Sequence, residues 1–347
     1  MSLARLGFAL AKPILHKMDA EQAHLLTIKA LKTGVGHGAQ TVAPAALKVK
    51  LFGLEFPNPI GLAPGFDKNA EVPDAMLAQG FGFVEIGTVT PRPQAGNARP
   101  RLFRLVEDQA VINRMGFNNE GHDAVLRRLE ARRNRGGIVG VNIGANKDSD
   151  DRVADYVKGL AAFRPVASYI TINISSPNTP GLRNMQGREE LSNLLRTLNK
   201  TRPSGLPMLL KIAPDLVEAD LQDVADVCGQ EGVSGVIISN TTISRPALSS
   251  PLRGETGGLS GKPLFDLATR QLKLFHAITG GRLPLIGVGG ISDAETAYAK
   301  IRAGASLIQL YSALVYQGPG LVQSITQGLT SKFAAGGHSS ITDVVGT

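Results

Sequence analysis

The sequence predicts an α/β fold, a (β/α)8 (TIM) barrel with an N-terminal helical extension. Eight short, β-branched apolar segments recur beyond about residue 45, and helical segments separate most of them. Their apolar character is nearly continuous, which is typical of parallel strands covered on both faces. The expected strands are residues 59–63, 83–88, 138–142, 169–173, 207–211, 235–239, 283–287 and 306–310.

The expected helices are residues 123–133, 151–163, 188–200, 216–228, 263–277, 293–303 and 320–333. For the helix at 293–303 we expect a capping box, with Ser292 as N-cap and Glu295 three positions later. An open, doubly wound sheet is the rival architecture. It usually has fewer strands, and its dinucleotide-binding form needs a G-x-G-x-x-G motif after the first strand, which this sequence lacks. Eight strands over about 300 residues therefore favour the barrel.

Two connections are too long to be simple turns. Residues 89–138 contain two short alternating segments, 101–106 and 110–113, which predict a small hairpin over the barrel. Residues 240–264 are rich in Gly, Ser, Pro and Thr. Long insertions in a compact barrel are usually functional loops, although flexible spacers are the alternative.

The first 40 residues form a separate unit in this interpretation, an amphipathic helical extension that precedes a catalytic barrel over 41–347. We expect Asp19 to cap the second helix, with Gln22 at its third position. The two helices could dock on the barrel, or they could lie on a membrane surface as a hairpin. The residues at helical spacing are Leu3, Leu6 and Leu10, then Ala23, Leu26, Ala30 and Leu31.

Composition excludes several classes of protein. The 43% hydrophobic and 19% charged content argues against disorder, and no apolar run reaches the roughly 18 residues of a spanning helix. The single cysteine, Cys228, cannot form an internal disulfide, and no Cys or His cluster predicts a metal site. The chain carries 37 Lys and Arg against 29 Asp and Glu, a net charge of +8. With no Trp and no long basic run, this charge favours an anionic small molecule or lipid over nucleic acid.

Polar residues follow the expected strands, and in this fold functional groups gather at that end of the barrel. Lysines there favour an anionic ligand, and amides favour a planar heterocycle because Asn offers both donors and acceptors. Local backbone capping is the alternative role for each one. These residues are Lys68, Thr88, Asn142, Asn173, Lys211, Ser239, Asn240, Gly289, Gly290, Tyr311 and Ser312.

Glycine-rich segments at 287–292 and 304–312 close the last two strands. Barrels often bind phosphate at this place, where backbone N–H groups and a helix N-terminus face the anion. The sequence therefore predicts a phosphorylated ligand, with ordinary glycine turns as the alternative. The loop at 173–183 contains Ser176 between Asn173 and Asn178. No Ser-His-Asp arrangement is evident, so residue types alone suggest a hydrogen-bonding serine.

Five motifs in matching order resemble the dihydroorotate dehydrogenase family: Gly65-Phe-Asp-Lys-Asn69, Asn113-Arg-Met-Gly-Phe-Asn118, Asn173-Ile-Ser-Ser-Pro-Asn-Thr-Pro-Gly181, Ser239-Asn-Thr-Thr242 and Gly257-Gly-Leu-Ser-Gly261. The resemblance runs from about residue 15 to 333. The N-terminal helices resemble the class 2, quinone-dependent, membrane-associated form. This resemblance implies bound FMN, oxidation of (S)-dihydroorotate to orotate, and a quinone as final electron acceptor in de novo pyrimidine (UMP) biosynthesis.

The resemblance also implies roles for individual residues. Ser176 matches the catalytic base, which takes a proton from C5 while C6 passes a hydride to the flavin; class 1 relatives use a cysteine, but Cys228 lies in an expected helix. Substrate-contacting positions are Lys68, Asn113, Arg114, Met115, Gly116, Phe117, Asn173, Asn178, Asn240 and Thr241. Cofactor-contacting positions are Ala63, Pro64, Gly65, Lys68, Thr88, Asn142, Asn173, Lys211, Ser239, Gly261, Gly290, Tyr311 and Ser312. Quinone-site positions are His24 and Arg104.

The implied partners are dihydroorotate and orotate, a quinone and an anionic membrane surface, and we expect a monomer. The implied location is the cytoplasmic side of the cell membrane as a peripheral protein, or the mitochondrial inner membrane for a eukaryotic chain. Two other functions stay open at this point. One is a phosphate-binding barrel that performs isomerisation or aldol chemistry through its lysines. The other is a flavin-binding membrane module without turnover.

Overall fold

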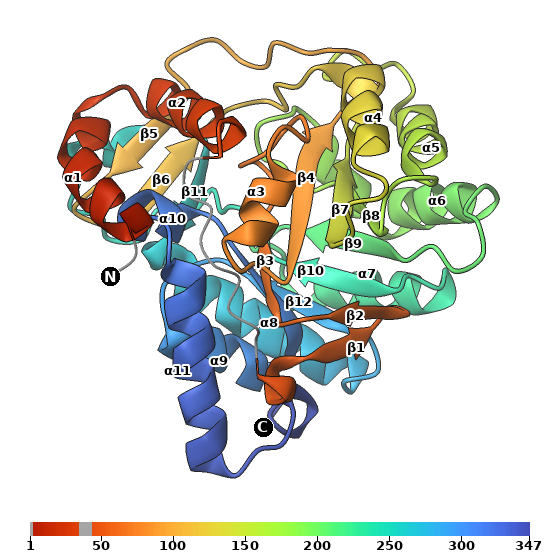
Figure 1. The fold of residues 1–347 in the computed structure, drawn as a ribbon. Coiled ribbons are helices and arrows are strands. Elements are labelled where there is room, and N and C mark those ends of the chain that lie inside the picture. The colour runs from red at the N-terminus through yellow and green to blue at the C-terminus, as the bar shows by residue number, and fades with distance from the viewer. Residues whose placement is uncertain (1–2, 35–43) are drawn as a thin grey trace.

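The computed structural model describes residues 3–34 and 44–347, and it contains a closed barrel of eight strands (Figure 1). Every neighbouring pair in the barrel is parallel, and the strand order is β10-β12-β13-β3-β4-β7-β8-β9. The predicted barrel is confirmed, with each strand within two residues of its expected bounds. The strands are β3 Ile60–Leu62, β4 Phe83–Val89, β7 Ile138–Ile143, β8 Tyr169–Asn173, β9 Met208–Ile212, β10 Gly235–Ile238, β12 Leu285–Val288 and β13 Ala305–Leu310.

Helices surround the barrel and bury one apolar face each. In α6 the residues Leu191, Leu194, Leu195 and Leu198 are all fully buried, which is the spacing of one helix face. The seven predicted helices are present, and α3 and α10 are two short helices that were not predicted. The helices are α3 Pro73–Ala78, α4 Gly121–Ala131, α5 Arg152–Phe163, α6 Arg188–Asn199, α7 Glu218–Gln230, α8 Phe265–Thr279, α9 Ala294–Arg302, α10 Ser312–Gln317 and α11 Leu321–Gly336.

The expected cap of α9 is wrong by one residue. Asp293, not Ser292, is the N-cap: its Oδ1 accepts from the backbone N–H of Thr296 at 2.8 Å. The Thr296 hydroxyl oxygen accepts from the Asp293 N–H at 3.1 Å and completes the capping box. A carboxylate suits this position better than a hydroxyl because the helix N-terminus carries partial positive charge.

A second, three-stranded antiparallel sheet covers part of the barrel mouth. It consists of β5 Leu102–Leu105, β6 Ala110–Asn113 and β11 Gly258–Gly261, in the order β11-β6-β5. The β5–β6 hairpin confirms the prediction for residues 101–113. The third strand comes from the other long connection, and the pairing of the two insertions was not predicted. A further hairpin, β1 Val49–Leu51 with β2 Leu54–Phe56, lies at the opposite end of the barrel (Figure 1).

The N-terminal helices are α1 Leu3–Lys17 and α2 Ala20–Lys32, and they lie beside the three-stranded sheet (Figure 1). Asp19 caps α2 as predicted, since its Oδ1 accepts from the N–H groups of Glu21 and Gln22. Of the expected apolar face, Ala23 and Leu31 are buried, but Leu26 is 47% exposed. The expected domain boundary at residue 40 lies outside the described residues. Within the described ranges, no helix combines the length and apolar character needed to cross a bilayer.

Aromatic rings fill the amino-terminal end of the barrel and require glycine opposite them. Phe83 packs against Phe56 of β2 with ring centroids 5.2 Å apart. An ideal Cβ on Gly61 would lie 2.2 Å from the Phe83 ring, and one on Gly140 would lie 2.1 Å from the Tyr169 ring. The two glycines therefore make room for the aromatic floor of the barrel.

We predict that Gly140→Ala lowers the free energy of unfolding by about 3 kcal/mol, the upper part of the usual range for overpacking. The Tyr169 ring cannot retreat easily because its hydroxyl donates to the buried Glu85. Equilibrium chemical denaturation measures the change. Gly229→Ala in α7 is the matched control, since its Cβ would meet nothing within 4 Å. Equal stability of the two variants would contradict this packing.

Candidate active site

A cavity of about 960 Å³ opens at the carboxyl ends of the barrel strands, and the three-stranded sheet and N-terminal helices complete its walls. Most of the sequence-predicted site residues line this cavity. They are His24, Ala63, Pro64, Gly65, Lys68, Thr88, Arg104, Asn113, Met115, Gly116, Phe117, Asn173, Ser176, Asn178, Lys211, Ser239, Asn240, Thr241, Gly261, Gly290, Tyr311 and Ser312. Two predicted residues, Arg114 and Asn142, are not in the cavity wall.

Arg114 makes its contacts outside the cavity. Its Nη1 donates to Glu255 Oε2 at 2.7 Å, and its guanidinium carbon lies 4.4 Å from the centre of the Phe103 ring. Asn113 ends β6 and lines the cavity, and successive side chains of extended backbone point to opposite sides. The substrate contact expected for Arg114 is therefore not supported by its position, and the residue instead ties β6 to the loop before β11.

A buried carboxylate organises the layer beneath the cavity. Glu85 of β4 is fully buried inside the barrel and accepts three hydrogen bonds. The donors are Asn142 Nδ2 at 2.7 Å, Gln309 Nε2 at 2.6 Å and the Tyr169 hydroxyl at 3.1 Å. The sequence signal for Glu85 is a lone acid in an apolar strand, and neither Glu85 nor Gln309 was among the predicted site residues.

Asn142 connects Glu85 to two residues at the floor of the cavity. Its Oδ1 accepts from the Thr88 hydroxyl at 2.6 Å and from Asn173 Nδ2 at 3.1 Å. Asn173 Nδ2 also donates to Thr88 Oγ1 at 2.8 Å. Asn142 therefore acts in this structure through Thr88 and Asn173, which do line the cavity, rather than by lining it.

Two lysines bring positive charge to the cavity. Burial lowers the pKa of Lys211, and it lowers the pKa of Lys68 to about 8 even though Glu21 lies near enough to oppose the effect. Among the described residues, neither ammonium group has a hydrogen-bond or ion-pair partner. Lys211 is buried and Lys68 is partly buried. Cations removed from solvent are normally paired, so these two indicate an anionic or electron-rich ligand.

Ser176 lies on the loop that follows β8 and is 6% exposed. Its Oγ accepts from the backbone N–H of Asn178 at 3.2 Å, and Asn178 Nδ2 donates to the Asn113 carbonyl oxygen at 3.1 Å. The histidine that lines the cavity from α2, His24, bonds to Tyr311 rather than to Ser176. Backbone and amide contacts therefore hold this serine, and residues 3–34 and 44–347 contain no Ser-His-Asp arrangement around it.

The glycine turns meet at one end of the cavity. Gly261 and Gly290 have φ angles of 94° and 78°, and a Cβ on either would come within 2.4 Å of neighbouring atoms. Ser312 at the start of α10 lies beside them and donates to Ser260 Oγ at 2.8 Å. At such glycine turns a ligand can approach the backbone N–H groups directly, and together with the neighbouring serine hydroxyls they form a surface typical of phosphate sites.

The N-terminal helices form a roof that is fixed by buried polar contacts. Arg101 contacts Glu21 of α2 with two hydrogen bonds, Nη2 to Oε1 at 2.7 Å and Nε to Oε2 at 3.0 Å, and this lowers the pKa of Glu21. Arg104 donates to the carbonyl oxygen of His16, in the last turn of α1, at 3.0 Å. Burial lowers the pKa of His24 to about 3, so its ring is neutral beside Tyr311.

Comparisons with known proteins agree on one family. Residues 46–333 match the family model described as dihydroorotate dehydrogenase. The chain is 58% identical to dihydroorotate dehydrogenase (quinone) from Parvibaculum lavamentivorans, with 98% of both chains covered. It is 55% identical to the protein of that name from Novosphingobium aromaticivorans, with 98% of this chain and 99% of that one covered. The crystal structure of DHODH in complex with ferulenol from Eimeria tenella superposes with a TM-score of 0.91 at 37% identity, covering 96% of this chain and 98% of that one.

We predict that Glu85→Gln lowers the free energy of unfolding by about 2 kcal/mol. Glutamine replaces one accepting carboxylate oxygen with an N–H₂ group, so at least one of the buried donors around Glu85 loses its acceptor. Chemical denaturation measures this loss. Glu55→Gln is the control: Glu55 pairs with Lys50 on the surface, where ion pairs contribute little. If Glu85→Gln is as stable as Glu55→Gln, the buried carboxylate does not organise the barrel interior.

Proposed function

This chain belongs to the dihydroorotate dehydrogenase family, and on that premise we propose that it oxidises (S)-dihydroorotate to orotate in pyrimidine biosynthesis. FMN is the proposed hydride acceptor and a quinone the final electron acceptor. One observation carries the proposal: a serine, a group of amides and two lysines converge in a large cavity beside paired glycine turns, and no described residue pairs with either lysine. This combination suits an anionic substrate next to a phosphorylated cofactor.

The residues present fit FMN. The glycine turns at Gly261 and Gly290, with Tyr311 and Ser312, would hold the ribityl phosphate end. Thr88, Asn173 and Ser239 would contact the ring, and Lys211 would place its charge beside it. When bound, FMN supplies two-electron redox chemistry that protein side chains lack. Asn142 would act one layer below, by orienting Thr88 and Asn173.

Substrate and product both carry a carboxylate on a six-membered ring, and the ring of the product orotate is planar. Lys68 would pair with that carboxylate, and the amides of Asn113, Asn178 and Asn240 would bond to the ring oxygens and N–H groups. Thr241 Oγ1 is buried, and no partner for it lies among the described residues, so it is a donor available to a ligand. These contacts orient the substrate so that C5 faces Ser176.

Ser176 Oγ would accept the C5 proton while the hydroxyl passes its own proton to a water molecule. A serine hydroxyl is a weak acid, so the negative charge that develops on Oγ as its own proton leaves needs stabilisation. The Asn178 N–H, which already donates to this oxygen at 3.2 Å, supplies it. Ser176 would therefore act as a base whose oxygen is stabilised by a backbone N–H of the same loop.

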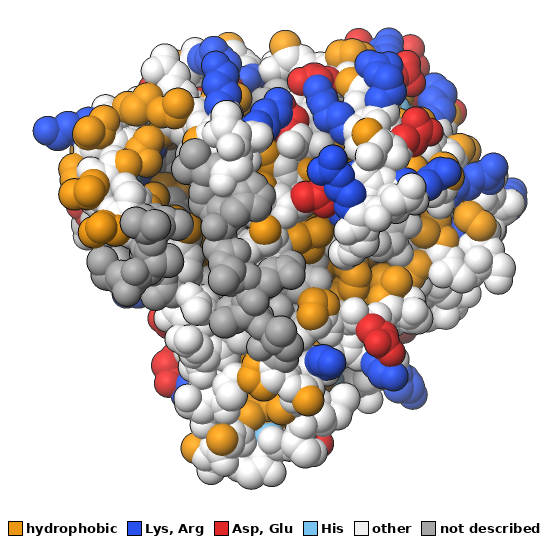
Figure 2. Space-filling view, viewed as in Figure 1, with side chains coloured by type: hydrophobic (Ala, Val, Ile, Leu, Met, Phe, Trp, Pro, Cys, Tyr) orange, Lys and Arg blue, Asp and Glu red, His pale blue; other side chains and the backbone are white. Residues whose placement is uncertain are grey.

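We assign residues 1–40 to a membrane-facing extension and 41–347 to the FMN-binding catalytic barrel. Large apolar side chains of α1 and α2 are exposed: Leu6, Leu10, Ile14, Leu25 and Leu26. Figure 2 shows apolar side chains gathered over this corner of the molecule. With Lys17 and Lys29 also exposed, the helices suit peripheral binding to an anionic lipid surface on the cytoplasmic side.

The same helices suit entry of a lipid-soluble quinone. Their inner faces contribute Phe8, Ala11, Leu15 and Ala30 to the cavity wall. This wall is apolar and continues to the barrel mouth, where His24 and Arg104 lie. We propose that the quinone approaches by this route and that His24 and Arg104 line it.

We predict that the purified protein is yellow, that dihydroorotate bleaches it without air, and that quinone restores the colour. Ser176→Ala should keep the colour but bleach at least about 10²-fold more slowly, since the base is lost. Ser192→Ala on α6 is the control. Bleaching of Ser176→Ala at the wild-type rate would remove Ser176 from the mechanism. A colourless protein that forms a borohydride-trappable imine would instead support lysine chemistry.

We predict that Leu10→Glu with Ile14→Glu reduces binding to anionic vesicles and slows reoxidation by a long-chain quinone, because two exposed apolar contacts with lipid are replaced by charge. Reoxidation by a short, water-soluble quinone should not change. Val217→Glu is the matched control, since Val217 is similarly exposed at 63% but precedes α7. Equal vesicle binding by all three proteins would reject the membrane-facing role of α1.

A further inference from the structure

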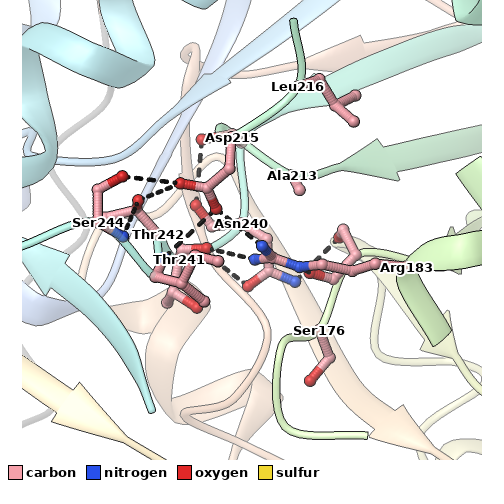
Figure 3. A network of polar contacts seen from close by, with 12 residues as sticks. Ser176, Arg183, Ala213, Asp215, Leu216, Asn240, Thr241, Thr242 and Ser244 are labelled. Carbon is pink, nitrogen blue, oxygen red and sulfur yellow. Dashed lines mark hydrogen bonds and ion pairs between the residues drawn. The ribbon is translucent and has the colours of Figure 1, made fainter. Parts of the chain in front are cut away.

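We propose that Arg183 and Asp215 form a clamp that positions Ser176 for proton removal; this inference rests on the proposed function. Figure 3 shows the two residues at the centre of a polar network that spans neighbouring loops. Those loops follow β8, β9 and β10, which are adjacent strands of the barrel. Neither residue lines the cavity, so both would act through the groups they hold.

Arg183 connects all three loops with one guanidinium group. Its Nε donates to the Ser175 carbonyl oxygen at 3.0 Å, and one terminal nitrogen donates to the Thr241 carbonyl oxygen at 2.9 Å. The other terminal nitrogen contacts Asp215 Oδ2 at 2.8 Å. The planar group therefore fixes the relative positions of the loop with Ser176 and the loop with Thr241.

Asp215 extends the clamp along the loop after β10. Its Oδ1 accepts from the Thr242 hydroxyl and, at 3.4 Å, from the Ser244 hydroxyl. Its Oδ2 accepts from the Ile243 backbone N–H at 3.3 Å. The carboxylate thus holds three consecutive residues beside Thr241 while it orients the guanidinium of Arg183.

The contact to Ser175 determines how Ser176 is presented. The Ser175 carbonyl and the Ser176 N–H belong to the same rigid peptide plane. A hydrogen bond that fixes this carbonyl also fixes the N–Cα bond of Ser176, so that only rotation about φ can still redirect its Cα–Cβ bond. In Figure 3 the Ser176 side chain lies apart from the dashed contacts of Arg183 and Asp215, and Ser176 lines the cavity.

Partial burial makes the clamp stronger than a surface ion pair. The Arg183 side chain is 21% exposed and the Asp215 side chain 16% exposed, so solvent screens them weakly. Lysine could keep the charge pair but not the three directed contacts, because only the guanidinium offers donors in a fixed planar fork. This difference gives the conservative variant Arg183→Lys its value as a test.

The experiment measures anaerobic reduction of the FMN-loaded enzyme by dihydroorotate, with protium or deuterium at C5. We expect Arg183→Met and Arg183→Lys to retain bound FMN and to be reoxidised by quinone at the wild-type rate. Reduction should slow by about 10²-fold, the usual effect of misplacing a reacting group by about 1 Å. The C5 isotope effect should rise, because proton removal then limits the rate. Asp215→Asn should fall between these variants and wild type.

Arg132→Met is the matched control. Arg132 forms an ion pair of the same length, 2.8 Å, with Asp74, and it joins the end of α4 to α3. Wild-type reduction rate and isotope effect in Arg183→Lys would overturn the clamp, even if Arg183→Met failed to fold. Equal slowing in Arg132→Met would also overturn it, as a general effect of instability. If wild type itself is not reduced by dihydroorotate, the proposed function fails, and the clamp as stated fails with it.

Discussion

Closure of eight parallel strands is the constraint on which the rest of this structure depends. A parallel ring ends every strand at one rim, so residues as far apart in sequence as Lys68 and Ser312 share one cavity. The ring also encloses an interior that must be filled. Aromatic rings fill its lower end, and the hydrogen-bonded carboxylate of Glu85 occupies the layer below the cavity. Strand closure therefore produces both the site and its support.

Two sets of contacts hold the proposed reacting groups from different directions. From below, Glu85 orients Asn142, which orients Thr88 and Asn173 at the cavity floor. From the side, Arg183 holds the carbonyl groups of the two loops that flank the substrate position. Both sets consist of contacts between residues of the chain itself. They restrict the groups that line the cavity, which reduces the ordering that a ligand must induce.

The barrel and most of the site could be predicted from sequence because their signals are local. An apolar segment followed by a polar residue identifies a strand end, and strand ends in a barrel converge. The errors and omissions concern pairings that no local pattern contains. Glu85 and Gln309 are 224 positions apart, and Arg183 and Asp215 lie on different loops. Side-chain direction is a second source of error: the motif 113–118 does not show that Asn113 faces the cavity while Arg114 contacts Glu255.

The attachment of α2 to the barrel restricts how such a protein can evolve. Glu21 is bonded to Arg101 of the barrel insertion, and His24 touches Tyr311 beside the proposed cofactor site. The leading helices thus form a wall of the cavity as well as the surface that we propose to face lipid. An unrelated anchor in their place would restore attachment to a bilayer but leave this cavity open to bulk water. On the proposed function, tethering and catalysis are therefore inherited together, and neither can be exchanged without rebuilding the other.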